Sequence, residues 1–111
     1  MVAGEASGDL LASLLIQSLK KRLPDARFFG IGGPKMQAVG FQALFPAEKL
    51  AVRGYAEVLK HYREIAGIRR KLLSAMLSDP PQAFIGVDAP DFNLHLEKCL
   101  KARGIPAIHY V

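Results

Sequence analysis

The sequence predicts an α/β fold, a Rossmann-like parallel sheet with helices on both faces. Short apolar runs alternate with segments whose apolar residues recur every three or four positions, as in β-α-β units. Glycine or proline marks most passages from one kind of segment to the next. A chain of 111 residues buries one modest core, so we expect residues 1–111 to form a single domain.

The first predicted unit is a short strand followed by a helix. Residues 1–3 have the pattern of a strand, but a central strand typically has about 5 to 6 residues. Either its pairing is marginal or further strand residues lie upstream. Ser7 is predicted to cap the helix, which ends near Pro24. Its apolar residues recur at helical spacing and should pack on the sheet: Leu10, Leu11, Leu14, Leu15, Leu19 and Leu23.

Two further strands and a short helix are predicted next. Residues 27–31 form the second strand, and Gly32-Gly33-Pro34 begins a short helix that Gly40 closes. Residues 42–45 have a weaker strand pattern.

The second half of the chain repeats the alternation. Residues 55–77 form the longest predicted helix, and residues 83–87 form an apolar strand. A helix over 91–103 and a strand over 107–111 complete the pattern, with Gly104 in the turn between them.

The composition indicates a globular protein of a reducing compartment. The chain is 50% hydrophobic and 23% charged, and no apolar run approaches the roughly 18 residues of a membrane-spanning helix. Any membrane contact should therefore be peripheral. The N-terminal residues lack an export-signal pattern. Cys99 is the single cysteine and has no partner for an internal disulfide, so we expect a cytoplasmic protein with a packed thiol.

The net charge of +5 is concentrated in the long helix, where residues 55–77 hold five basic and two acidic side chains. One side of this helix is apolar and is interrupted by Arg69. The apolar side comprises Tyr55, Val58, Leu59, Tyr62, Ile65, Ala66, Leu72, Leu73, Met76 and Leu77; Lys60, Arg63, Arg70 and Lys71 lie opposite. Either the helix packs on the core with a solvated basic face, or its apolar side is partly exposed to lipid. Nucleic-acid binding is disfavoured, because neither a base-stacking aromatic pattern nor a recognition helix is present.

Polar side chains follow two of the predicted strands, at the edge where ligands bind in open α/β sheets. These candidate residues are Glu5, Ser7 and Asp9 after the first strand, and Asp88, Asp91 and Asn93 after the strand over 83–87. They either contact a ligand or serve as caps and turn residues. The glycines near residue 5 match neither the P-loop nor the dinucleotide pattern. No metal or other cofactor is expected, since His61, His95 and His109 lack metal-ligand spacing.

Four segments resemble lipid A disaccharide synthase, a bacterial inverting glycosyltransferase with two Rossmann-like domains. They are Val-Ala-Gly-Glu-Ala-Ser-Gly-Asp at 2–9, Gly-Gly-Pro-Lys-Met-Gln-Ala at 32–38, Val-Asp-Ala-Pro-Asp-Phe-Asn at 87–93 and Ile-His-Tyr-Val at 108–111. The resemblance covers the chain but only the N-terminal, acceptor-side domain of the family. It implies one half of a GT-B type glycosyltransferase, in which the C-terminal domain binds the donor. The chain alone is therefore expected to be inactive.

The resemblance also implies a reaction of lipid A and lipopolysaccharide biosynthesis in Gram-negative bacteria. The 6-hydroxyl of 2,3-diacylglucosamine 1-phosphate (lipid X) attacks UDP-2,3-diacylglucosamine, giving the β-1,6-linked disaccharide 1-phosphate and UDP. A sugar hydroxyl needs a general base at neutral pH, and Asp88 is the candidate. Asp91 would orient that base or bind the acceptor, with Glu5, Ser7 and Asn93 as further substrate contacts.

The acylated substrates imply contact with the inner membrane surface. Val58, Leu59 and Tyr62 would meet acyl chains, while Lys60 and Arg63 would meet anionic headgroups. The protein would then be cytoplasmic and peripheral to that membrane. The alternative is a non-catalytic α/β binding module that retains only the acceptor half of the site.

Overall fold

In a computed structural model of the chain, the described residues are 1–46, 55–87 and 90–110. Strands and helices alternate along them and confirm the predicted α/β fold. The elements are β1 (Val2–Ala3), α1 (Ala6–Arg22), β2 (Phe29–Gly32), α2 (Pro34–Ala38), β3 (Gln42–Pro46), α3 (Tyr55–Ser78), β4 (Phe84–Val87), α4 (Pro90–Ala102) and β5 (Ala107–Tyr110).

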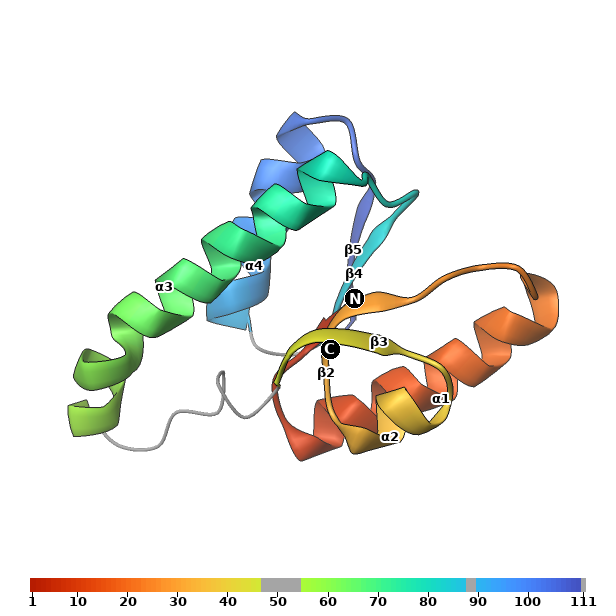
Figure 1. Cartoon of the computed structure of the whole chain (residues 1–111), viewed down its shortest axis with the longest axis horizontal. Coiled ribbons are helices and arrows are strands. Elements are labelled where there is room, and N and C mark those ends of the chain that lie inside the picture. Colours follow the sequence, from red (N-terminus) through yellow and green to blue (C-terminus); the bar gives the residue numbers. More distant parts are fainter. Residues whose placement is uncertain (47–54, 88–89, 111) are drawn as a thin grey trace.

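The strands form one parallel sheet in the order β3-β2-β1-β4-β5 (Figure 1). The two-residue strand β1 lies at its centre, where Val2 pairs with Ile31 of β2 and Gly86 of β4. Because all the pairs are parallel, every strand ends at the same edge of the sheet. The turns that lead into α1, α2 and α4 follow strands that end at this edge, which we call the carboxyl edge.

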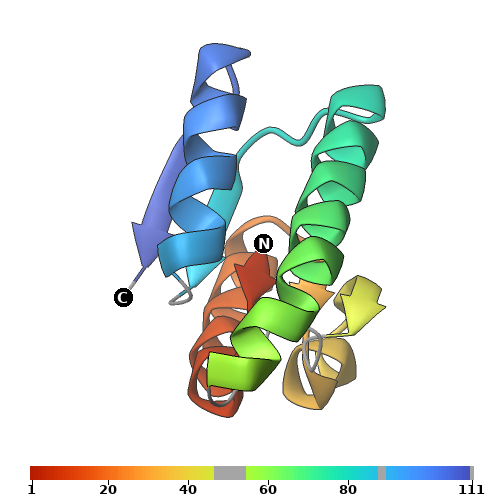
Figure 2. The same ribbon diagram turned by 90° about the vertical axis from the view of Figure 1, so that its left-hand side faces the viewer.

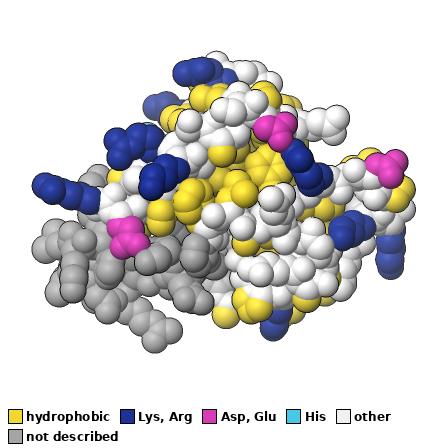
Figure 3. Space-filling view, viewed as in Figure 1, with side chains coloured by type: hydrophobic (Ala, Val, Ile, Leu, Met, Phe, Trp, Pro, Cys, Tyr) yellow, Lys and Arg dark blue, Asp and Glu magenta, His cyan; other side chains and the backbone are white. Residues whose placement is uncertain are grey.

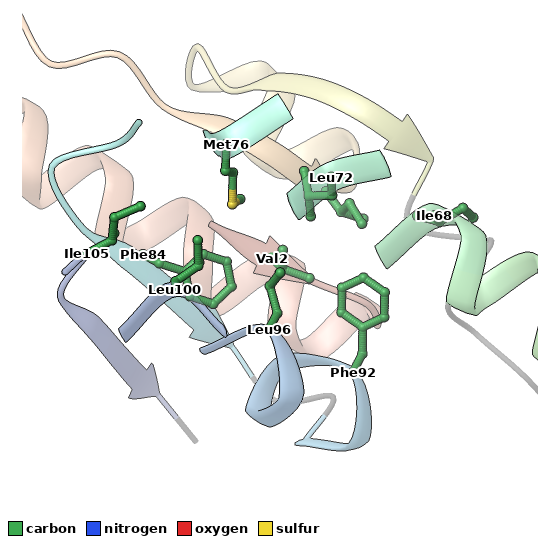
Figure 4. Packing of buried hydrophobic residues seen from close by; sticks show 10 residues of the cluster. Val2, Ile68, Leu72, Met76, Phe84, Phe92, Leu96, Leu100 and Ile105 are labelled. Carbon is green, nitrogen blue, oxygen red and sulfur yellow. The ribbon is translucent and has the colours of Figure 1, made fainter. Parts of the chain in front are cut away.

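Helices cover both faces of the sheet, with α3 and α4 on one side and α1 and α2 on the other (Figures 1 and 2). The α3/α4 side buries Val2, Ile31 and Phe84 of the sheet under Ile68, Leu72 and Met76 of α3 and Phe92, Leu96 and Leu100 of α4 (Figure 4). The α1/α2 side buries Met1, Ala3 and Val87 under Ala12, Ile16 and Met36. The alternation of residues 1–3 between these layers is that of a buried strand.

Helix α1 differs from the prediction at its start and in the face that it buries. It begins at Ala6 with Glu5 in the N-cap position, so the prediction that Ser7 caps it is wrong. Its buried face consists of Gly8, Ala12 and Ile16 with Asp9 and Ser13, whereas Leu10, Leu14 and Leu23 of the predicted leucine stripe are exposed. A Cβ on Gly8 would lie 3.5 Å from the Ala3 Cβ and 3.6 Å from a Val87 methyl group. The small residues therefore let α1 approach the sheet, which turns several leucines outward.

Candidate functional site

Glu5 and Ser7 lie at the carboxyl edge and are exposed. Ala3 pairs with Val87, so the chain leaves β1 and β4 side by side at this edge. Gly8 packs against both strand ends and fixes the first turn of α1 above them. Glu5 and Ser7 are thus accessible to a ligand, and their role in binding stays a prediction.

The predicted base Asp88 lies outside the described residues. In the sequence it stands between Val87, the last residue of β4, and Pro90, the first residue of α4. Asp91 is in the first turn of α4, and its side chain is likewise not described. Asp88 and Asp91 thus remain candidates by their position in the sequence.

Asn93 is buried between α4 and the sheet, with none of its surface exposed. Its Nδ2 donates a hydrogen bond to the Val2 carbonyl oxygen at 3.3 Å. A Cβ on Gly86 would lie 3.0 Å from the Asn93 Cβ and Cγ, so the glycine makes room for the amide. This geometry favours a positioning role: Asn93 fixes the first turn of α4 to the central strand. Its direct contact with substrate stays a prediction that the burial does not favour.

Asp9 also has a structural role at this edge, where it holds the start of α2. The residue is 4% exposed, and its carboxylate accepts hydrogen bonds from the backbone N–H groups of Gly33, Lys35 and Met36, at 3.2, 3.0 and 2.9 Å. The helix has no side-chain cap of its own, because Gly33 occupies its N-cap position. A carboxylate from α1 satisfies these donors instead. This role was not predicted from the sequence, although the absence of a capping side chain before Pro34 could have indicated such a partner.

A second buried carboxylate joins α4 to the edge strand β5. The Glu97 side chain is 6% exposed, and its Oε1 lies 3.3 Å from Nδ1 of His109. Glu97 belongs to α4, and His109 pairs with Gly86 in the sheet, one residue before the end of β4, so the pair links a helix to the edge strand. Among the residues that the structure describes, no group of three or more His, Cys, Asp or Glu is placed to hold a metal ion.

Helix α3 has a basic outer face where its side chains are described. Arg63, Arg70 and Lys71 are exposed, while Ile68 and Leu72 are buried against the sheet. Basic side chains are visible along this side of the molecule in Figure 3. Of the predicted membrane contacts, only Arg63 has a described side chain; Val58, Leu59, Lys60 and Tyr62 lie outside that set. In the described part of the chain, no helix is long and apolar enough to cross a membrane.

A parallel sheet with helices on both faces and polar turns at its carboxyl edge is the Rossmann-like architecture of GT-B glycosyltransferase domains. The family described as lipid-A-disaccharide synthetase matches residues 1–111. The chain therefore belongs to the lipid-A-disaccharide synthase family, which confirms the resemblance seen in the sequence.

Curated relatives agree with this assignment. The chain is 68% identical to the lipid-A-disaccharide synthase of Azoarcus sp. (strain BH72), over all of this chain and 28% of that protein. It is 64% identical to the synthase of Aromatoleum aromaticum and 68% identical to that of Dechloromonas aromatica, over all of this chain and 28% and 29% of those proteins. The chain thus spans less than a third of the length of these relatives.

Proposed function

We propose that the chain forms the acceptor-side half of an enzyme that makes the lipid A disaccharide. The enzyme would transfer 2,3-diacylglucosamine with inversion from UDP-2,3-diacylglucosamine to 2,3-diacylglucosamine 1-phosphate. The observation that carries the proposal is the carboxyl edge, where exposed Glu5 and Ser7 lie beside the end of β4 in a chain of this family.

The acceptor hydroxyl needs a base as the new bond forms. Its oxygen attacks the anomeric carbon of the donor sugar, the bond from that carbon to UDP breaks, and Asp88 takes the hydroxyl proton. Asp88 directly follows Val87, the last residue of β4, and Asn93 anchors the next helix one turn later. Asp91 would orient the base or bind acceptor hydroxyls.

The departing UDP requires groups beyond this half of the site. We assign donor binding to residues of the longer relatives that have no counterpart in these 111 residues, since GT-B enzymes place the two substrates between two domains. Holding both reactants in register supplies a large part of the rate. A non-catalytic module that binds only the acceptor is the alternative function.

A chimera separates the two functions. We expect activity when this chain replaces the matched 111 residues of the 68% identical Azoarcus synthase, and no disaccharide from the 111-residue chain alone. The measurement is UDP release and disaccharide formation from the two acylated substrates. A folded but inactive chimera would favour the binding module, whereas Asp88-dependent UDP release by the chain alone would show a donor site within it.

We further propose that the early turns of α3 contact the membrane surface that carries the acylated substrates. Arg63, Arg70 and Lys71 are exposed in the described part of this helix, and exposed basic side chains opposite an apolar side are the charge pattern of a peripheral membrane helix. In this proposal Val58, Leu59 and Tyr62 enter the acyl region, while Lys60 and Arg63 meet anionic headgroups.

Vesicle co-sedimentation tests the membrane proposal. The chain should pellet with anionic vesicles and be released at high salt. Arg63→Gln should weaken binding about five-fold, since one charge near such a surface contributes about 1 kcal/mol. The double change Val58→Ser and Leu59→Ser should abolish binding.

The matched control is Leu10→Ser with Leu14→Ser, which removes two leucines that are 43% and 52% exposed on α1. This control should pellet like the parent. Unchanged binding after the Val58 and Leu59 changes would contradict the proposal. Loss of the circular dichroism signal in that variant would instead place both residues in the core.

A further inference from the structure

One row of paired residues crosses the strands β1, β4 and β5 near the carboxyl edge. Gly86 of β4 pairs with Val2 of β1 on one side and with His109 of β5 on the other. The row lies one residue before the end of β4 at Val87. Helix α4 lies over this part of the sheet (Figure 2). The contacts between α4 and the row therefore fix where the helix lies relative to the end of β4.

Helix α4 makes a polar contact with each end of this row. Asn93 and Glu97 lie one helical turn apart on its buried side and are 0% and 5% exposed. The Asn93 amide donates a hydrogen bond to the Val2 carbonyl oxygen on β1. Oε1 of Glu97 meets Nδ1 of His109 on β5, and among the described residues neither atom has another hydrogen-bond partner. The helix is thus joined to both neighbours of β4.

These polar contacts define the place of α4 more sharply than its apolar contacts do. Phe92, Leu96 and Leu100 bury the helix in the core, but the burial of apolar surface has no preferred direction. A hydrogen bond, in contrast, weakens steeply as its angle departs from the optimum. Two such contacts, one turn apart on the helix and two strands apart on the sheet, fix both its position along the sheet and its rotation about its own axis.

Stability alone does not account for a carboxylate at residue 97. Removing the Glu97 carboxylate from water costs free energy that a contact with one imidazole offsets only in part. Apolar side chains that filled the same space would stabilise the fold equally well or better. What the buried pair adds is a single preferred arrangement of α4 on β5.

We propose that Glu97 and His109 are positioning residues of the reaction. Their contact joins α4 to β5 and so holds the start of α4 beside the end of β4, and Asp88 stands between these two segments in the sequence. Without the contact the two segments could shift relative to each other, and a displacement of about 1 Å can cost about 10² in rate. The inference rests on the proposed base role of Asp88.

The protonation of the His109 ring tests the contact in the chain alone. Nitrogen-15 NMR reports which ring nitrogen carries a proton, and we expect Nδ1 to carry one at about pH 8, where a free imidazole is neutral. In Glu97→Ala this proton should move to Nε2, since the hydrogen bond selects the tautomer, while the ring of His95 should be unaffected. An Nδ1 without a proton in the parent chain would overturn the contact and the inference with it.

Turnover of the chimera with the Azoarcus synthase tests the positioning role. Glu97→Ala should lower kcat about ten-fold and change KM less than about two-fold, because the groups that bind substrate remain. Glu97→Gln keeps an acceptor oxygen for the Nδ1 proton and should restore most of the rate. His109→Leu removes the donor and should act like Glu97→Ala, with losses that do not add because both changes break one contact. His109→Leu also carries the test if Glu97→Ala does not fold.

Leu100→Ala is the matched control on the same helix. Leu100 is 0% exposed, so the alanine should destabilise the fold through lost packing and leave the contact between Glu97 and His109 in place. At a temperature where circular dichroism shows every variant folded, its kcat should stay within about two-fold of the parent.

Three results would overturn the inference. Equal losses of kcat in Glu97→Ala and Leu100→Ala would show that the pair acts through stability alone. A loss in Asp88→Asn without one in Glu97→Ala would refute the positioning role while the base assignment stands. Unchanged kcat in Asp88→Asn would refute the base assignment and the inference that rests on it, whatever the protonation of the His109 ring.

Discussion

Asp88→Asn is expected to lower the turnover of the chimeric synthase by about 10² or more while the fold is retained. The amide has nearly the shape of the carboxylate but cannot accept the proton of the acceptor hydroxyl at neutral pH. The expectation rests on the proposed base role and on the position of Asp88 directly after β4. Turnover is measured with both acylated substrates saturating, so that a change in binding does not enter the rate.

The controls distinguish the base from other carboxylates of the chain. Asp25→Asn makes the same chemical change at an exposed residue near the opposite edge of the sheet, and it should leave turnover unchanged. Glu5→Gln and Ser7→Ala should act mainly on KM if these exposed groups bind substrate. Turnover of Asp88→Asn within a few-fold of the parent would contradict the assignment and make Asp91 the next candidate.

The sequence predicted the fold well because its apolar periodicity and its glycine and proline positions act locally. The strand-helix alternation, the parallel sheet and the short first strand were all predicted, and the structure confirms them. The orientation of α1 was not predicted, since it depends on the close approach of Gly8 and Ala12 to the sheet. In the sequence, the leucines of this helix predict its buried face more strongly than its small residues do. In the structure, the buried face is instead the one whose small residues fit closely against the sheet.

The sequence predicted at which edge of the sheet Glu5 and Ser7 lie, but it did not predict the structural contacts of Asp9 and Asn93. Parallel topology alone brings Glu5 and the end of β4 together, and that follows from the pattern of elements. The structural roles of Asp9 and Asn93 could not be read from their neighbours, because their partners are 24 and 91 residues away. A polar residue after a strand has the same local pattern whether it faces a ligand or satisfies a buried backbone group.

Asp9→Ala should destabilise the folded chain by about 3 kcal/mol. The substitution leaves the N–H groups of Gly33, Lys35 and Met36 without their carboxylate acceptor in a buried place. Asp9→Asn keeps one acceptor oxygen and should cost about half as much. The measurement is urea unfolding followed by circular dichroism, with Asp25→Ala as the control that changes stability by less than about 0.5 kcal/mol.

Gly33→Ala tests whether Asp9 acts through this contact. A Cβ at position 33 would lie 2.5 Å from Oδ2 of Asp9, so the alanine should displace the carboxylate and destabilise the chain. In the Asp9→Ala background that clash is absent, and Gly33→Ala should cost less there. A smaller cost of Gly33→Ala in the Asp9→Ala background is a coupling between the two positions. It arises in the double-mutant cycle only if the Asp9 carboxylate contacts the start of α2. Two results would contradict this role: additive losses of unfolding free energy in the cycle, or a loss below about 0.5 kcal/mol for Asp9→Ala. Either would show that other contacts hold α2. Asp9 would then again be a candidate for ligand binding at the carboxyl edge.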